Sequence, residues 1–230
     1  MRFAVIACRV FNRELSSEIA QCPNLADLFW VEQELHNTPV VLSTEIQKNI
    51  NTIDASAVEY DAILLLYGLC SNGVLGVFSS KYDIIIPKTD DCIGIFLGSQ
   101  QRYLDIFHAN KGTYWYIPGW YENGSLPSED DFAKRHEFYS KEYGEDNADY
   151  LIETEMASLL RYSNCACINS TVFNPDGFFL FSKRASQFFK WRYNEFNGDT
   201  CLIKKLLSGD WDESFIRCSK HEKLKGWLNK

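Results

Sequence analysis

Residues 61–73 read DAILLLYGLCSNG, and this stretch decides the fold. Its first part, residues 61–67, is a continuous apolar run of strand length. Such a run is typical of a strand that is buried on both faces of a parallel sheet. Gly68 and Gly73 then bracket a turn that carries Cys70. Because glycine lets main-chain N–H groups come close to a ligand, we expect this turn to be a binding loop.

Similar apolar runs stand on both sides of this stretch and alternate with amphipathic segments. We expect further strands at residues 2–7, 28–33, 82–87 and 112–118, and helices at residues 12–20, 39–50, 74–78 and 92–107. Strands that alternate with helices in this way form βαβ units. The sequence therefore predicts an α/β fold of the Rossmann-like kind, with a mostly parallel sheet and flanking helices.

The remainder of the chain is richer in helical patterns. We expect helices at residues 129–143, 148–162, 182–196 and 201–207, and short strands at residues 165–168 and 214–218. The expected organisation is a Rossmann-like α/β region over residues 1–120 that carries a cysteine site. An α-rich C-terminal half, residues 121–230, completes the same lobe or a second one.

Composition narrows the classes of function. The chain of 230 residues is 46% hydrophobic, which is enough for a large core, and its net charge of −8 argues against nucleic-acid binding. No apolar run approaches the roughly 20 residues of a membrane-spanning helix, and no signal-peptide core is present. We therefore expect a cytoplasmic protein. In that compartment its eight cysteines are expected to be free, catalytic or metal-bound rather than disulfide-bonded.

Three of the eight cysteines stand where predicted strands end: Cys8, Cys70 and Cys92. In an open α/β sheet, ligands collect outside the carboxyl ends of the strands, so these thiols can meet at one edge. Three thiolates form an incomplete metal site that leaves a position for substrate or water. Each cysteine alone also fits a small buried apolar residue. For Cys8, the following helix start and Arg9 are expected to favour the thiolate.

Other polar residues are candidates for the same edge. Asp91 precedes Cys92 and can cap a helix or transfer a proton. Lys88 follows the fourth strand and can position a substrate. His36 lies between a strand and a helix and is our candidate for a fourth ligand or an acid–base group, with an exposed loop histidine as the other interpretation.

Cys165 and Cys167 form a competing motif. Residues i and i+2 of a strand face the same side, so the two sulfurs could bind one ion. No second Cys or His pair stands nearby at zinc-ribbon spacing. We therefore favour two small residues that pack on one face of a strand.

Several short motifs carry a family resemblance: residues 67–73, Ile86-Pro87, residues 91–93, residues 97–99, residues 112–115 and residues 118–120. Together they resemble the domain of unknown function 1638 family. The resemblance implies a soluble prokaryotic protein, often from anaerobes and in some genomes encoded near corrinoid-dependent methyltransferases. It also implies that Cys8, Cys70 and Cys92 belong to the family pattern. The family commonly has a histidine where this chain has Asp90.

The function expected from the residues and the resemblance is metal-dependent. We expect Cys8, Cys70 and Cys92 to bind a [4Fe–4S] cluster with one open iron that acts on a small thiolated or methylated substrate. His36, Asp91 and Lys88 are the expected catalytic residues, and Gly68 and Gly73 are expected to help bind the cofactor. The alternatives are a zinc–thiolate methyl-transfer protein, or a non-enzymatic accessory protein that binds metal or corrinoid and has a methyltransferase as partner.

Overall fold

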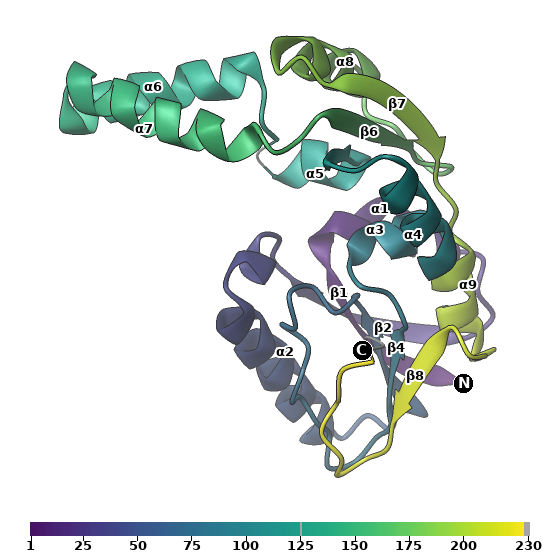
Figure 1. Ribbon diagram of the computed structural model, residues 1–230. Helices are drawn as coiled ribbons and strands as arrows, with labels where there is room; N and C mark the ends of the chain where they lie inside the picture. Colours follow the sequence, from purple (N-terminus) through teal and green to yellow (C-terminus); the bar gives the residue numbers. More distant parts are fainter. Residues whose placement is uncertain (125, 228–230) are drawn as a thin grey trace. The chain divides into compact units, whose positions relative to one another are not determined.

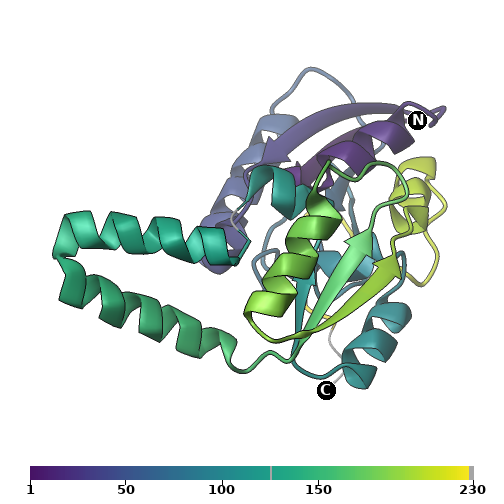
Figure 2. The same ribbon diagram turned by 90° about the horizontal axis from the view of Figure 1, so that it is seen from above.

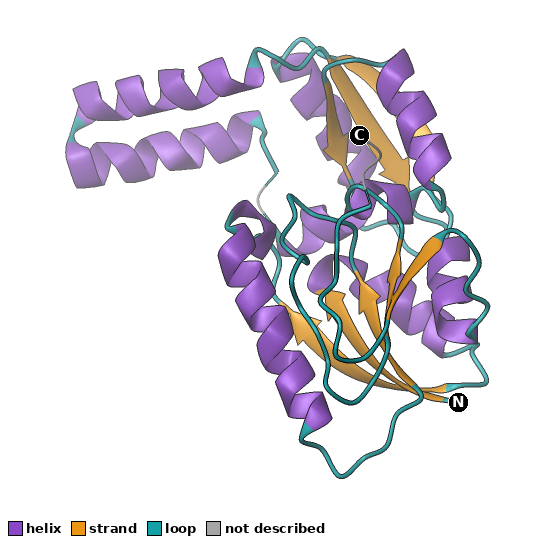
Figure 3. Cartoon of the chain, turned by 60° about the horizontal axis from the view of Figure 1, so that its bottom comes forward, coloured by secondary structure: helices purple, strands orange, loops and turns teal. Residues whose placement is uncertain are grey.

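The computed structural model describes residues 1–124 and 126–227. The chain divides into two units, and neither is one continuous stretch. Unit 1 contains residues 1–104, 170–173 and 198–230, and unit 2 contains residues 105–169 and 174–197. Each unit is built around its own β-sheet (Figure 3).

Unit 1 contains a five-stranded sheet in the order β2-β1-β3-β4-β8. The strands are β1 (Arg2–Cys8), β2 (Leu25–Val31), β3 (Ala62–Leu66), β4 (Ile84–Pro87) and β8 (Phe215–Cys218). The first four are parallel, and β8 is antiparallel to β4. The expected α/β fold with a mostly parallel sheet and flanking helices is confirmed.

The strand order contains a reversal beside β1. The chain places β2 on one side of β1 and then returns to place β3 on the other side. The connections that follow β1 and β3 therefore leave the carboxyl ends of these strands in opposite directions. Such a reversal is where open α/β sheets bind their ligands.

Helices cover both faces of this sheet (Figure 1). On one face, α2 (Pro39–Asp54) buries four aliphatic side chains, Leu42, Ile46, Ile50 and Ile53, against β1 and β3. The Thr38-Pro39 start that the sequence predicts is confirmed, with proline in the first turn. On the other face lie α1 (Asn12–Ile19) and α9 (Cys201–Ser208).

Two segments of unit 1 differ from the sequence prediction. The helix expected over residues 92–107 is two helices, α3 (Cys92–Phe96) and α4 (Gln100–Ala109). Gly98 separates them because it adopts φ +72°, a left-handed conformation that ends a helix. Residues 74–76 form a turn and residues 77–78 have no regular structure, so the expected short helix is absent from this described segment, which continues the irregular stretch that begins at Cys70.

Unit 2 contains a second, fully parallel sheet in the order β5-β6-β7. The strands are β5 (Thr113–Tyr116), β6 (Asn164–Asn169) and β7 (Arg192–Asn197). The helix expected over residues 182–196 is wrong in its second half. The helix α8 (Phe178–Phe188) ends early, and residues 192–197 pair in register with β6 as β7.

The remaining helices of unit 2 are α5 (Pro118–Asn123), α6 (Glu129–Tyr143) and α7 (Glu145–Leu159). Gly144, at φ +86°, joins α6 to α7 in a tight antiparallel hairpin (Figure 2). Throughout the residues that the structure describes, no helix has the length and hydrophobicity needed to cross a membrane.

Candidate functional site

The register of the sheet places Cys8 beside the end of β3. Ala7 pairs with Leu66, so the next positions, Cys8 and Tyr67, are neighbours. Side chains alternate along a strand, and Cys8 therefore shares the α2-facing side with Ala4 and Ile6. Cys8 consequently lies half-buried at the carboxyl end of β1, beside the end of β3.

The Cys70 loop has an unusual backbone. Cys70, Ser71 and Asn72 adopt φ values of +44°, +57° and +67°, so three consecutive non-glycine residues are left-handed. Each such residue costs about 1–2 kcal/mol relative to a right-handed conformation. Conformations of this kind persist where the surrounding structure imposes them, and they are concentrated at functional sites.

Two hydrogen bonds join this loop to the segment that follows β4. The Leu69 N–H donates to the Thr89 carbonyl at 2.9 Å, and the Cys70 N–H donates to the Asp90 carbonyl at 3.1 Å. A Cβ on Gly68 would lie 2.6 Å from the Asp91 Cα and carbonyl carbon. Gly68 is thus required because the loop that carries Asp91 approaches its backbone closely. The sequence had led us to expect a ligand at this glycine instead. A Cβ on Gly73 would meet the Leu42 side chain at 2.7 Å.

Cys92 occupies the first turn of α3, as the sequence predicts. Asp91 is the N-cap residue and accepts a hydrogen bond from the Ile93 N–H at 2.8 Å. The Tyr103 hydroxyl donates to the other Asp91 oxygen at 3.1 Å. Burial raises the pKa of Asp91 despite these donors. Both carboxylate oxygens therefore hold α3 and α4 in place, so capping is a role that the geometry supports for Asp91.

The three thiols lie close enough to influence one another electrostatically. Burial raises the pKa of Cys70 to about 12, with smaller contributions from Asp91 and Cys8. Burial also raises the pKa of Cys92 well above its usual value, and Cys70 adds to the rise. The backbone N–H groups of Gly68 and Cys92 oppose the shift of Cys70. The loops after β1, β3 and β4 therefore bring the three predicted cysteines together.

The expected thiolate character of Cys8 is wrong. Burial raises the pKa of Cys8, and the backbone N–H of Val10 lowers it only in part. The segment after Cys8 is a single 3-10 turn, Arg9–Phe11, which offers a weaker positive end than a long helix. Arg9 pairs instead with Glu32, at 2.6 Å between Nε and Oε1. All three thiols are consequently protonated near neutral pH when no ligand is bound.

Tyr67 lies among the thiols and was missed as a site residue. Its hydroxyl is buried and hydrogen-bonds to the Cys8 thiol, and this contact lowers the pKa of Cys8. Burial raises the pKa of Tyr67 well above the usual value, and Cys8, Cys70 and Cys92 each add to the rise. The signal in the sequence was a tyrosine that ends an otherwise aliphatic strand. The Tyr67 hydroxyl therefore belongs to the same cluster of side chains as the three thiols.

The thiols are gathered but do not form a completed metal centre. Among the residues that the structure describes, no three His, Cys, Asp or Glu side chains have the arrangement of a metal-binding group.

His36 lies in the 3-10 turn η2 (Leu35–Asn37) that follows β2, the strand paired with β1, and it is half-buried. Burial lowers its pKa, and Glu34 opposes this shift.

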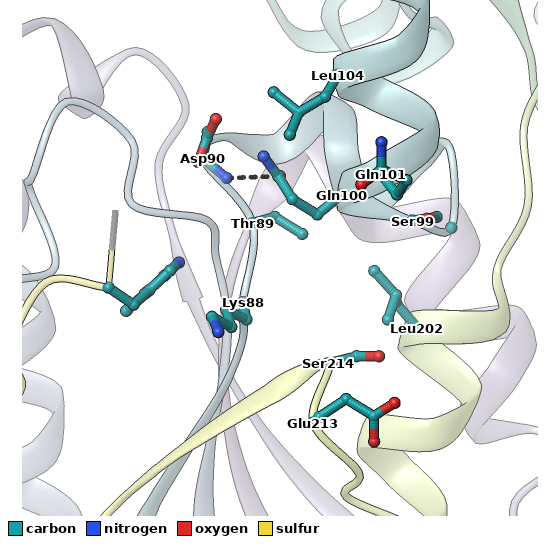
Figure 4. Close-up of a pocket in the computed structure, with 12 residues that line it drawn as sticks. Lys88, Thr89, Asp90, Ser99, Gln100, Gln101, Leu104, Leu202, Glu213 and Ser214 are labelled. Carbon is teal, nitrogen blue, oxygen red and sulfur yellow. Dashed lines mark hydrogen bonds between the residues drawn. The ribbon is translucent and has the colours of Figure 1, made fainter. Parts of the chain in front are cut away.

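Lys88 lines a cavity of about 600 Å³ beside the cysteine loops (Figure 4). The lining combines the segment 88–90 after β4, residues 98–104 around the start of α4, Leu202 of α9 and residues 213–214 before β8. Gln100 fixes one wall, because its side-chain oxygen accepts from the Asp90 N–H at 2.9 Å. No ion pair of Lys88 is formed within the described chain, so its cation remains available in the cavity.

A family model described as "Protein of unknown function (DUF1638)" matches residues 30–207 of this chain. The matched range includes Cys70 and Cys92 and begins after Cys8. No curated protein and no solved structure matches the chain.

Proposed function

The chain belongs to the DUF1638 family of proteins of unknown function, and we propose a role for it from its own site. We propose that Cys8, Cys70 and Cys92 are the protein ligands of a [4Fe–4S] cluster with one open iron, acting on a small thiolated or methylated substrate. The observation that carries the proposal is that Cys8, Cys70 and Cys92 stand at or just after the carboxyl ends of β1, β3 and β4, which are neighbours in the sheet beside the strand-order reversal. That position is the common ligand site of open α/β sheets.

The donor chemistry fits the cluster. Cysteine thiolates are the ligands that iron–sulfur clusters use, and three of them leave one iron without a protein ligand. The thiols are protonated without metal, so binding must release their protons. The Tyr67 hydroxyl hydrogen-bonds to the Cys8 thiol and would orient that sulfur as a ligand. The left-handed turn at residues 70–72 holds the Cys70 sulfur toward the Cys92 backbone N–H.

A bound cluster with an open iron supplies a Lewis acid for a sulfur or oxygen atom of the substrate. The residues of this chain have separate tasks. Lys88 binds an anionic part of the substrate in the adjacent cavity, and the hydrogen bond from Asp90 to Gln100 keeps that wall in place. Asp91 orients Cys92 through the helix start that it caps. His36, in the turn after β2, is the proposed acid–base group.

Anaerobic purification followed by reconstitution with ferrous iron and sulfide tests the proposal. The expected product is a brown protein with broad absorption near ~400 nm, as cysteine-bound clusters give. The absorption must disappear in Cys70→Ala and persist in Cys165→Ala, a matched substitution in unit 2.

Two other results would redirect the proposal. A colourless protein with one zinc that depends on the same cysteines would establish the zinc–thiolate alternative. A folded protein that binds neither metal would overturn the proposal for both metals. A metal-bound protein that remains inactive toward thiolated and methylated small molecules would favour an accessory role in metal or corrinoid delivery.

A further inference from the structure

The cavity beside Lys88 is lined by two residues whose polar side-chain atoms are buried and have no partner. Thr89 is 1% exposed, and its hydroxyl makes no hydrogen bond within the described residues. The indole N–H of Trp227 is also buried and unpartnered in the part of the chain that the structure describes. Burial of such a group without a hydrogen bond is costly. Both groups therefore indicate that a ligand atom completes them when the cavity is occupied.

Thr89 is fixed in the wall of the cavity. Its N–H donates to the Pro87 carbonyl at 2.9 Å, and its carbonyl accepts from the Leu69 N–H at 2.9 Å. A Cβ on Gly94 would lie 3.0 Å from the Thr89 Cβ, so α3 supports the residue closely. Figure 4 shows the Thr89 side chain between Lys88 and Gln100. The unpartnered hydroxyl thus belongs to a packed wall of the fold.

The available polar groups around Thr89 are mostly hydrogen-bond donors. Lys88 is the cation of the lining and forms no ion pair within the described chain. The Gln100 side-chain oxygen already accepts from the Asp90 N–H, so its NH₂ group is the part left to contact a ligand. The ten-residue helix α4 begins at this wall, and its first turn adds positive potential. These groups favour an anion.

Two carboxylates limit the charge of that anion. Asp90 and Glu213 also line the cavity, and neither forms an ion pair within the residues described. Two carboxylates against one lysine give the lining a net charge of −1. A phosphate dianion is therefore repelled more strongly than a singly charged group. A carboxylate carries one charge, and its two oxygens can accept from the Lys88 ammonium and the Thr89 hydroxyl together.

The remainder of the lining fits a short apolar chain. Leu104 comes from α4, and Leu202, which is 4% exposed, comes from α9. The Trp227 side chain adds an aromatic surface. The volume of about 600 Å³ is within the usual range of small-molecule sites, about 300–1,000 Å³. The cavity thus combines apolar walls with a few polar groups, as such sites do.

Asp90 joins this cavity to the cysteine loops. Its N–H donates to Gln100 in the cavity wall at 2.9 Å, and its carbonyl accepts from the Cys70 N–H at 3.1 Å. The next residue, Asp91, caps the helix that begins at Cys92. A ligand on Lys88 and Thr89 is therefore bound to the segment that leads directly into the cysteine site.

We propose that this cavity binds a short monocarboxylic acid. The carboxylate binds Lys88 and Thr89, and the apolar chain lies against Leu104 and Leu202. The thiolated or methylated substrate is then a carboxylic acid rather than a phosphate ester. Its role as the substrate rests on the proposed function, whereas its binding to the cavity does not.

A set of four small probes tests the proposal on the full, metal-free chain. Methylthiopropionate combines a carboxylate with a methylated sulfur on a short chain. Isothermal titration calorimetry is expected to show saturable binding with a dissociation constant at or below about 1 mM. The neutral methylthiopropanol is expected to bind at least about tenfold more weakly, because the charge-assisted hydrogen bonds are lost. The cationic methylthiopropylamine and inorganic phosphate are expected to show no saturable binding.

Matched variants locate the acid. Lys88→Gln is expected to weaken binding at least about tenfold, and Thr89→Val about three- to tenfold. Thr89→Val is also expected to keep the thermal stability of the metal-free chain, because the hydroxyl that it removes has no partner. The controls are Lys223→Gln and Thr52→Val, at exposed positions of unit 1 outside the cavity, and neither is expected to change binding. Thermal unfolding establishes that each variant folds.

Three results would overturn the proposal. Equal binding of the acid by the wild type, Lys88→Gln and Thr89→Val would place it elsewhere. Tighter binding of the amine than of the acid would mean that Asp90 and Glu213 determine the ligand. Tighter binding of phosphate than of the acid would make this a phosphate site.

Metal content measured on reconstituted samples of the same chain separates this proposal from the metal site. A chain that binds the acid and forms no cluster would overturn the cluster and support the carboxylic acid site. A chain that forms the cluster and does not bind the acid would overturn the carboxylic acid site alone.

Discussion

The two groups of cysteines in this chain occupy different positions in their sheets. In unit 1, Cys8 is the last residue of β1, Cys70 and Cys92 follow β3 and β4, and all three are half-buried. Cys165 and Cys167 lie inside β6 of unit 2, fully buried beneath α8, where their sulfurs contact the backbone carbonyl and the hydroxyl of Ser182. Burial raises thiol pKa values in both groups. The direction of the pKa shift therefore does not distinguish the two groups of cysteines. Their backbone conformation and their exposure to solvent distinguish them.

The comparison gives the two groups different roles. The Cys165 pair fills space between a strand and a helix and is surrounded by aromatic side chains. The three strand-end cysteines lie beside a left-handed turn, beside a glycine that a side chain cannot replace, and beside the buried Tyr67 hydroxyl that contacts Cys8. Packing explains the first arrangement fully. The strand-end cysteines lie beside a strained left-handed backbone, at residues 70–72, that packing does not explain. Strained backbone of this kind is concentrated at binding sites.

The largest expected difference comes from replacing one cysteine of each group with glycine. Cys165→Gly is expected to cost about 2–3 kcal/mol, because it empties a buried strand position and adds chain flexibility. Cys70→Gly is expected to leave the metal-free protein equally stable or to stabilise it by up to about 1 kcal/mol, because glycine adopts the φ of +44° without strain. Urea denaturation of both variants measures the difference. Equal losses would contradict the strain assigned to the Cys70 turn.

The close approach of the two loops in unit 1 gives the next effect. Gly68→Ala is expected to destabilise the chain by about 1–3 kcal/mol, because the added carbon would lie 2.6 Å from the Asp91 backbone. Gly226→Ala is the control, since its Cβ would come no closer than 3.7 Å to another atom. Thermal unfolding of the two variants gives the comparison. A Gly68 variant as stable as the Gly226 variant would mean that the loops separate easily.

Two tyrosines sharpen the contrast between the units. The Tyr116 hydroxyl in unit 2 donates to the Pro127 carbonyl at 2.7 Å, so Tyr116→Phe is expected to cost about 1–2 kcal/mol. Tyr67→Phe is expected to cost less than about 1 kcal/mol in the metal-free protein, because the partner that its hydroxyl loses is the Cys8 thiol, a weak hydrogen-bonding group. Chemical denaturation distinguishes the two substitutions. A loss at Tyr67 equal to that at Tyr116 would contradict the weak contact assigned to Tyr67.

The smallest effect is a difference in alkylation rate. Cys8, Cys70 and Cys92 are expected to react with iodoacetamide before Cys165 and Cys167, because they are partly accessible in the folded chain. The thiolate is the reactive form, and the raised pKa values mean that little is present at neutral pH. The rate should therefore increase about tenfold per pH unit below each pKa, which for Cys70 is about 12. Peptide-level mass spectrometry at several pH values measures this, and simultaneous labelling of both groups would contradict it.

Much of unit 1 follows from local sequence patterns. The apolar run at residues 61–67, the proline start of α2 and the capping aspartate before Cys92 each specify their element with nearby residues alone. The position of the three cysteines at strand ends could be predicted for the same reason. Whether the three cysteines meet depends on the order of the strands in the sheet. The alternation of strands and helices predicts a parallel sheet, and the structure shows that β1, β3 and β4 are neighbours in it.

Other features depend on contacts distant in sequence. Residues 192–197 form a strand because β6 provides a partner, although the aromatic residues before them continue a helical pattern. The protonated state of Cys8 follows from burial, which the following Arg9 does not reveal. The environment of Tyr67 requires three loops to be placed at once. The cofactor remains a prediction, because several metals use thiolate ligands.

The most direct test of the account is the metal content of the chain purified without oxygen. Iron, acid-labile sulfide and zinc should be measured per chain in the wild type, in Cys8→Ala/Cys70→Ala/Cys92→Ala and in Cys165→Ala/Cys167→Ala. The account predicts about four iron and four sulfide in the wild type and in the Cys165 pair variant, and none in the triple variant. Equal metal content in the triple variant and the wild type would contradict a site at the strand ends.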